Sequence, residues 1–305
     1  MKNLIFTCLA CVVLQFANAQ QDPMYTQFFS NKIVVNPAYA GTRESFSAVG
    51  LHRHQWAGIE GAPRTTTVSL HGPIEKWNTG LGLSLVHDQL GIQRNYSIKL
   101  AYAYRIKTKI GTISLGIDGQ YKKQDMLWMD SNPLTSDDSY IPYGNNTAWI
   151  PNFGAGIYIY KKNYYVGLSV PKLIQNEVDY SNASSVITNN YQRHYFGMAG
   201  VHLPLSSEFA LKPAVLAKYE VNSPLEMDFN LMAIFSEKFW IGMTYRTNDS
   251  FDAIMQIHLE NGLRIGYSYD FTTTQLNRVN TGSHEIMIGY DFNKAKKGFY
   301  HPRYF

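Results

Sequence analysis

Apolar and polar residues alternate along most of this chain, and the alternation constrains the fold more than any other feature. In the run from Tyr96 to Ile106 every second side chain is apolar, and the residues between are small or charged. The same period of two recurs in 262–272 and 283–293. Such a period places alternate side chains on opposite faces of a β-strand, whereas a helix repeats about every 3.6 residues. The chain is therefore predicted to be all-β.

The alternating runs number about fourteen, and each is close to the roughly 9 to 11 residues with which a tilted strand crosses a bilayer. They cover 44–56, 64–71, 78–88, 94–106, 110–122, 150–161, 163–170, 192–203, 208–220, 225–236, 238–247, 251–260, 262–272 and 283–293. In hydrocarbon an open sheet edge leaves backbone groups unpaired, so only a closed sheet spans a membrane. We expect a closed antiparallel transmembrane β-barrel of outer-membrane type over residues 44–293.

The connections between these runs fall into two sets when they are taken alternately. One set is short, at 107–109, 161–163, 204–207, 237 and 261–262, and the other holds the long connections 123–149, 171–191 and 273–282. Outer-membrane barrels have short periplasmic turns and longer extracellular loops. An even strand number then places both ends of the barrel on the periplasmic side. A large secreted β-sandwich is the soluble alternative.

Composition agrees with a chain that has a wide apolar contact. Charged residues make up 16% and aromatic residues 14%, whereas soluble domains average about 25% charged residues. A net charge of +4 is too small to argue for a nucleic-acid partner. Beyond the N-terminus no uncharged apolar stretch reaches the roughly 18 residues of a spanning helix.

The first 19 residues are predicted to be a cleaved signal peptide that exports the protein. Lys2 supplies the positive charge, an apolar stretch follows to Phe16, and Ala17-Asn18-Ala19 resembles a cleavage site. The alternatives are a membrane anchor and a lipoprotein acylated at Cys11. Both cysteines, Cys8 and Cys11, lie in this segment, so the mature chain is expected to lack disulfides and thiolate metal sites.

The polar face of the runs is expected to line the lumen with charges of both signs. They are Lys99, Arg105, Asp118, Lys212, Lys218, Glu226, Asp228, Arg264, Asp270 and Glu285. A mixed-sign lining predicts charge pairs between neighbouring strands rather than a single-sign selective pore. No long N-terminal domain is expected to plug the lumen, which argues against an energised nutrient transporter.

Motifs for chemistry are sparse, so we predict no enzyme, no catalytic residue, no cofactor and no metal site. His87-Asp88 ends a run, and Asp137-Asp138-Ser139 lies in the longest connection. A hydrolase assembled from such loop residues is the alternative, although adjacent polar residues in loops are usually turn formers. Asp130-Ser131-Asn132 resembles the start of a calcium loop, but Leu134 stands where an oxygen ligand is needed.

Several short motifs occur together in a characteristic order. They are Gln21-Asp22-Pro23, Gln27-Phe28-Phe29, the segment Asn36-Pro37-Ala38-Tyr39-Ala40-Gly41, Arg53-His54-Gln55-Trp56, Pro63, Gly72-Pro73-Ile74, Leu211-Lys212-Pro213, the stretch from Phe239 to Gly242, that from Leu263 to Asp270, and that from Ser283 to Met287. As a set they resemble the PorP/SprF family of the Bacteroidota, over nearly the whole mature chain. The basic tail after residue 293 departs from the family pattern.

The resemblance implies an integral outer-membrane barrel of the type IX secretion system, which exports surface adhesins and supports gliding motility. It implies contact with outer-membrane lipids, with periplasmic ring proteins, and with a large adhesin substrate that carries a C-terminal sorting domain. The expected function is support of adhesin secretion or surface anchoring through protein–protein contacts. A diffusion channel for a small solute is the alternative.

Nine residues are candidates for partner contact. They are Asn36, Pro37 and Gly41 before the first run, Arg53, Gln55 and Trp56 at its end, and Lys296, Lys297 and Arg303 in the tail. The first three also suit a simple turn, and the next three suit a lumen hydrogen bond and an interfacial aromatic. Two aromatic-rich segments flank the barrel, a periplasmic N-terminal segment at 20–43 and a periplasmic tail at 294–305. Both are expected to pack on protein, in the periplasmic mouth or against a partner.

Overall fold

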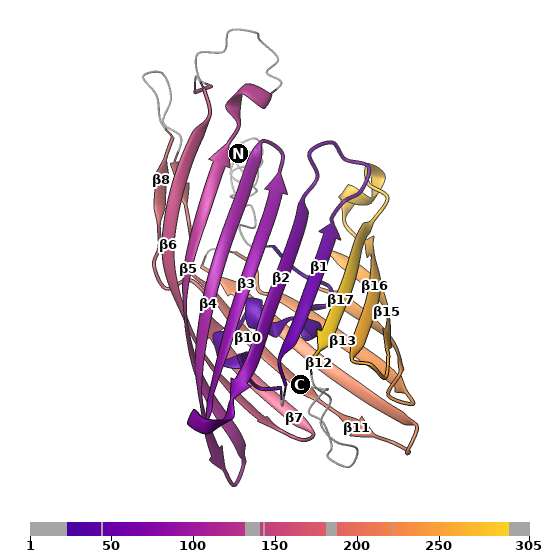
Figure 1. The fold of residues 1–305 in the computed structure, drawn as a ribbon. Coiled ribbons are helices and arrows are strands. Elements are labelled where there is room, and N and C mark those ends of the chain that lie inside the picture. Colours follow the sequence, from indigo (N-terminus) through magenta and orange to yellow (C-terminus); the bar gives the residue numbers. More distant parts are fainter. Residues whose placement is uncertain are drawn as a thin grey trace, which may run out of the picture.

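Fourteen antiparallel strands close into a barrel in the computed structural model of this protein (Figure 1). The structure describes residues 23–292 except 44, 132–140, 143, 181–187 and 222. Strands that follow one another in the chain pair with each other, and the first strand, β1 (Ser47–His54), pairs with the last, β17 (Ser283–Asp291), to close the wall. The predicted fold class is confirmed.

The wall follows the order of the chain. The strands between the first and the last are β2 (Arg64–Ile74), β3 (Thr79–Leu90), β4 (Gln93–Thr108), β5 (Gly111–Met126), β6 (Asn146–Lys161), β7 (Tyr164–Val170), β10 (His194–Val201), β12 (Phe209–Glu220), β13 (Glu226–Phe235), β14 (Phe239–Arg246), β15 (Ser250–His258) and β16 (Leu263–Thr272). β11 (Leu203–Pro204) continues β10 along β12. Each predicted run overlaps one barrel strand, with ends that differ by up to four residues.

The long connections carry short elements of their own. β8 (Glu177–Asp179) and β9 (Thr188–Asn190) form a small hairpin between β7 and β10, which the sequence pattern did not predict. The β5–β6 and β16–β17 connections contain the 3-10 turns η5 (Trp128–Asp130) and η6 (Gln275–Arg278), whereas η4 (Glu75–Trp77) lies in the short β2–β3 turn. None of the helices in the described ranges is long and apolar enough to cross a membrane.

The two faces of the wall differ as the alternation predicts. Large apolar side chains point outward and are exposed, for example Leu100, Ile117 and Leu168. Asp118 and Lys212, on the opposite face of their strands, are buried in the barrel. The outer face therefore suits lipid, and the inner face holds the charged groups.

The lumen is filled by the chain's own N-terminal residues, 23–43, which we call the plug segment. Its three 3-10 turns, η1 (Phe28–Ser30), η2 (Lys32–Val34) and η3 (Pro37–Tyr39), lie inside the barrel, as the indigo ribbon in Figure 1 shows. Every residue of the segment is buried except Pro23 and Val34, which are half-buried. The described part of the expected periplasmic segment therefore lies within the barrel, and about twenty residues suffice to plug it.

Apolar side chains hold the plug segment in place. Phe28, Phe29 and Ile33 belong to one buried cluster with Leu51 and Met287 of the wall. Each such side chain contributes about 1.5 to 3 kcal/mol when it is removed from water. The barrel thus has a hydrophobic core on its inside, where the sequence pattern predicted a charged lining.

Candidate functional site

The plug segment runs lengthwise through the lumen, from the long-connection end of the wall to the short-turn end. Pro23 lines a cavity together with Asp88 and Lys122, which lie near the long-connection ends of β3 and β5. At the other end, Arg43 binds Asp291, the last residue of β17, at 2.8 Å between Nη1 and Oδ1. The chain then enters β1 from the short-turn side.

Asn36 and Pro37 anchor the middle of the plug segment to the wall. Asn36 Oδ1 accepts a hydrogen bond from the backbone N–H of Ala38 at 2.9 Å, which caps η3, and Pro37 occupies its first turn. Asn36 Nδ2 donates to the carbonyl oxygens of Ile157 and Leu168 at 3.1 and 3.3 Å, on β6 and β7. One fully buried amide therefore serves both the turn and two strands.

Glycines in the wall make room for this turn. A Cβ atom on Gly116 of β5 would lie 2.1 Å from the backbone nitrogen of Ala38, and one on Gly156 of β6 would lie 2.2 Å from Asn36 Oδ1. Both distances are below any contact that a real side chain makes. Glycine in a strand interior commonly marks close approach of another backbone, and here the approaching backbone is the plug segment.

Gly41 turns the chain out of the lumen. Its φ of +70° is in the left-handed region, which glycine adopts without steric cost. Its N–H donates to His71 Nδ1 at 3.2 Å, and its carbonyl accepts from Arg105 Nη1 at 2.7 Å. A Cβ at this position would lie 2.5 Å from the Cα of Gly80.

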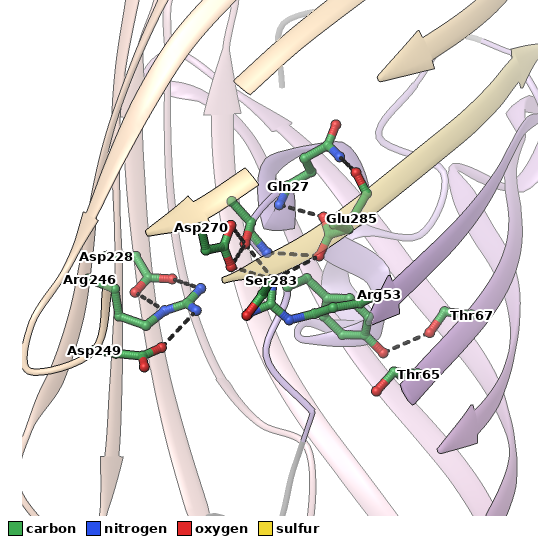
Figure 2. Close-up of polar contacts among 12 residues, drawn as sticks. Gln27, Arg53, Thr65, Thr67, Asp228, Arg246, Asp249, Asp270, Ser283 and Glu285 are labelled. Atoms are coloured by element: carbon green, nitrogen blue, oxygen red, sulfur yellow. Dashed lines mark hydrogen bonds and ion pairs between the residues drawn. The ribbon is translucent and has the colours of Figure 1, made fainter. Parts of the chain in front are cut away.

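Arg53 joins the plug segment to the strands that close the barrel (Figure 2). Its Nη1 lies 2.7 Å from Asp270 Oδ2 on β16 and 3.6 Å from Glu285 Oε2 on β17. The same nitrogen donates to Thr26 Oγ1 at 2.6 Å. Arg53 is only 2% exposed, so its charge is neutralised by these partners rather than by water.

The two acids also bind the plug backbone directly. Glu285 accepts the N–H groups of Thr26 and Gln27 at 3.0 and 2.8 Å, one on each carboxylate oxygen. Thr26 Oγ1 donates to Asp270 at 2.8 Å. A buried carboxylate with several donors is well satisfied. These contacts fix the upper half of the plug segment against β16 and β17.

Other lumen charges also form pairs between neighbouring strands, as the mixed-sign lining predicts. Arg246 makes a two-point contact with Asp228, at 2.8 and 3.1 Å (Figure 2). Lys99 Nζ lies 3.9 Å from Asp118 Oδ2 on the adjacent strand and donates to the Val34 carbonyl of the plug segment at 2.8 Å. Lys99 therefore links a charge pair of the wall to the plug segment.

Lys32 is a charged group in the middle of the plug segment. Its Nζ lies 4.4 Å from the ring centre of Tyr165 and 5.0 Å from that of Tyr39, at distances where cation and ring attract.

The other predicted residues do not join this site. Gln55 and Trp56 lie in the connection after β1, where Gln55 N–H donates to the Pro63 carbonyl at 3.0 Å and Trp56 N–H donates to Ser283 Oγ at 3.0 Å. Lys296, Lys297 and Arg303 lie outside the described residues, as does the expected tail at 294–305.

The comparisons with known proteins agree with this architecture. A model of the type IX secretion system membrane protein PorP/SprF family matches residues 17–290. The chain belongs to this family. No match was found among curated proteins.

Solved structures similar to this PorP/SprF-family barrel are distant in sequence. The monoaromatic hydrocarbon channel CymD is 11% identical, with 87% of this chain and 93% of CymD covered and a TM-score of 0.49. Omp33 of Acinetobacter baumannii is 8% identical, with 83% and 100% covered and a TM-score of 0.47. A FadL homologue of Pseudomonas aeruginosa is 10% identical, with 82% and 89% covered and a TM-score of 0.47.

Sequence reasoning named part of this site and missed the rest. It singled out Asn36, Pro37, Gly41 and Arg53, which all contact the plug segment or belong to it. It missed Thr26 and the two wall glycines at positions 116 and 156. The inward-facing glycines in otherwise regular strands were the available signal, whereas nothing local marks Thr26 as the partner of strands more than 240 residues away.

The contacts of the site hold the plug segment against the barrel wall. Arg53, Asp270 and Glu285 are engaged with one another and with Thr26 and Gln27 of the plug segment. Among the residues that the structure describes, no group of three or more His, Cys, Asp or Glu side chains is arranged to hold a metal ion. Asp88 of the His87-Asp88 motif accepts hydrogen bonds from Thr65 and Asn95, and Asp137-Asp138-Ser139 lies outside the described residues.

Proposed function

We propose that this PorP/SprF-family barrel is a plugged, non-conducting and non-enzymatic component of the outer-membrane secretion machinery. It supports the secretion or surface anchoring of large adhesins that carry a C-terminal sorting domain, and through them gliding motility. It acts by protein–protein contacts, with periplasmic ring proteins on one side of the membrane and the adhesin as client.

The filled lumen carries this proposal. The plug segment occupies the interior with apolar side chains, and its ends are bound by Arg53, Asp270 and Glu285 at one level and by Asp291 at another. A solute would have to displace this core to pass. The outer and end surfaces of the barrel are then the parts available for function, which favours contacts over conduction.

Two measurements on the same purified protein test the proposal. Planar-bilayer recording of the intact barrel is expected to give no steady conductance. A tagged pull-down from mildly crosslinked membranes is expected to recover secretion-machinery components or an adhesin. Steady conductance or solute uptake into liposomes, with no such partner recovered, would instead support the diffusion channel.

The tail at 294–305 is a second part of this proposal. It carries Lys296, Lys297 and Arg303 with several aromatic residues and no acid, which suits an acidic partner surface. Deletion of 294–305 is expected to leave barrel assembly intact, because β17 ends at Asp291, and to reduce surface delivery of the client. Unchanged delivery and unchanged partner crosslinking would remove the tail from the proposal.

A further inference from the structure

We infer that three neighbouring short turns of the barrel form a docking surface for an acidic periplasmic protein. The surface, which we call the basic turn patch, consists of Lys76, Trp77, Lys107, Lys109, Ile110, Lys161 and Lys162. The inference rests on the proposed function in one respect: it takes the barrel to work through protein contacts.

The three turns are adjacent in space although they are distant in sequence. The N–H of Arg105 near the end of β4 donates to the carbonyl of Asn78 in the β2–β3 turn at 2.8 Å. On the other side, Lys161 Nζ donates to the carbonyl of Lys109 at 3.5 Å, and Tyr164 Oη donates to the carbonyl of Ile110. The β4–β5 hairpin therefore lies between the other two turns: its strand β4 contacts the β2–β3 turn, and its tip contacts the β6–β7 turn.

The patch combines positive charge with exposed apolar groups. All five of its lysines are exposed. Trp77 and Ile110 are 63% and 58% exposed, as high as the lipid-facing residues of the wall. A large apolar side chain beside charged groups is the usual composition of an interface centre and its rim. The patch thus has both an anchor for a partner and a charge to orient it.

Charge on the six short turns is strongly asymmetric. The three patch turns hold five lysines and one acid, Glu75, which is bound to Arg105 at 3.3 Å. The other three short turns hold Glu208, Glu237 and Glu260 with one lysine, Lys238, which is bound to Glu260 at 3.0 Å. The three patch turns therefore attract acidic groups, and the other three repel them. Such a pattern orients a partner as it approaches.

Geometry favours a protein over lipid headgroups as the occupant. Lipid surrounds the barrel on all sides, so a lipid role predicts lysines at all six short turns rather than at three. The β4–β5 hairpin also projects beyond its neighbour β3. β3 begins at Thr79, which pairs with Tyr104 of β4, whereas the hairpin continues for four more residues, to the Thr108–Gly111 pair. At about 3.3 Å per residue this is roughly 13 Å of additional strand. Lys109 and Ile110 lie at the tip of this projection.

Site-specific photocrosslinking in intact cells tests the inference on the full-length protein. A benzophenone amino acid replaces Ile110, and in a control strain it replaces Leu259, which is 43% exposed on the acidic β15–β16 turn across the barrel. We expect a protein adduct at position 110, with an acidic surface on the identified partner, and little adduct at position 259. The double variant Lys109→Glu with Lys161→Gln is expected to lower the adduct by about tenfold or more, because charge reversal at an interface costs several kcal/mol.

A second double variant controls for net charge. Lys238→Glu with Asn261→Asp changes the total charge by the same amount on turns across the barrel from the patch, and we expect less than about a twofold change in adduct. Equal loss in both variants, equal adducts at 110 and 259, or adducts to phospholipid alone would each overturn the inference. Restoration of the adduct by an acid-to-lysine change in the partner would support it.

The same strains separate this inference from the proposed function. If the adduct depends on the lysines but client delivery does not depend on the barrel, the docking surface stands and the proposed function is wrong. If delivery depends on the barrel but position 110 gives no protein adduct, the proposed function stands and the docking surface is wrong.

Discussion

Arg53 is the residue at which closure of the barrel and seating of the plug segment meet. It lies on the first strand, its acidic partners lie on the last two strands, and its hydrogen-bond acceptor Thr26 belongs to the plug segment. Four segments therefore share one buried network. Networks of this kind stabilise when every member is satisfied and destabilise strongly when one is removed.

Replacement of Arg53 by methionine is expected to lower the free energy of unfolding by about 3 to 5 kcal/mol, because Asp270 and Glu285 then remain buried without their cation. The measurement is urea unfolding of the protein in phospholipid vesicles. The control is Lys238→Met, which breaks the exposed pair with Glu260 and is expected to cost less than about 1 kcal/mol. A similar loss of unfolding free energy in the two variants would show that the Arg53 network stabilises the barrel no more than an exposed ion pair does.

A methyl group at Gly116 is expected to unseat the plug segment, because a Cβ there would lie 2.1 Å from the backbone nitrogen of Ala38. Overpacking of this kind costs about 1 to 3 kcal/mol. The matched control is Gly119→Ala on the same strand, whose Cβ would meet only the ring of Phe153 at 3.9 Å. Trypsin cleavage after Lys32 is the measurement. It should accelerate in Gly116→Ala alone, and equal protection in both variants would contradict the fit described for η3.

At the scale of elements, the strands follow from the sequence and the plug segment does not. Each strand is recognisable because its apolar and polar residues alternate, with the apolar face toward lipid. This constraint acts on every residue along the strand. The plug segment has no such period, since its three turns face wall side chains all round. Its partners are fixed only when the barrel closes, so no local pattern records them.

One signal of a filled lumen was nevertheless present in the strands. Leu216, Met232, Ile234 and Met287 occupy positions on the otherwise polar face of their strands, and all four are buried against the interior. An open aqueous lumen has no use for large apolar side chains at such positions. Apolar residues on the inner face therefore indicate a packed interior, and this criterion applies to other barrel sequences.

Deletion of residues 23–43 is expected to leave a barrel that still closes, because all fourteen strands pair with one another without the plug segment. The variant should lose stability, since the inner apolar cluster and the Arg53 network lose their partners. We expect it to show conductance in a planar bilayer and to lose its folded gel mobility at a lower temperature than the intact protein. A silent and equally heat-resistant deletion variant would contradict the role of the plug segment as the seal.

At the scale of the whole molecule, the path of the plug segment places the two ends of the described chain, Pro23 and Phe292, toward opposite ends of the barrel. The sequence predicts both ends on the short-turn side, because the strand number is even. The plug segment changes this expectation for the N-terminal side. Its last residue, Arg43, binds Asp291 at the short-turn end, just before β1 begins. Its first residue, Pro23, lies beside Asp88 and Lys122 near the long-connection end. β1 in the wall and the plug segment in the lumen therefore run in opposite directions.

An epitope inserted between Asp22 and Pro23 is therefore expected to be accessible from the cell surface, whereas an epitope after Phe305 is not. Pro23 is half-buried near the long-connection end of the lumen, and long connections of outer-membrane barrels face outward. Antibody binding to intact and to permeabilised cells measures the difference. An epitope between Asn277 and Arg278 in the β16–β17 connection provides the outside control, and one after Lys238 provides the inside control. If the epitope before Pro23 reacts only after permeabilisation while both controls behave as expected, the plug segment enters the lumen from the opposite side in the cell, and its contacts with Glu285 and Asp291 must differ from those described.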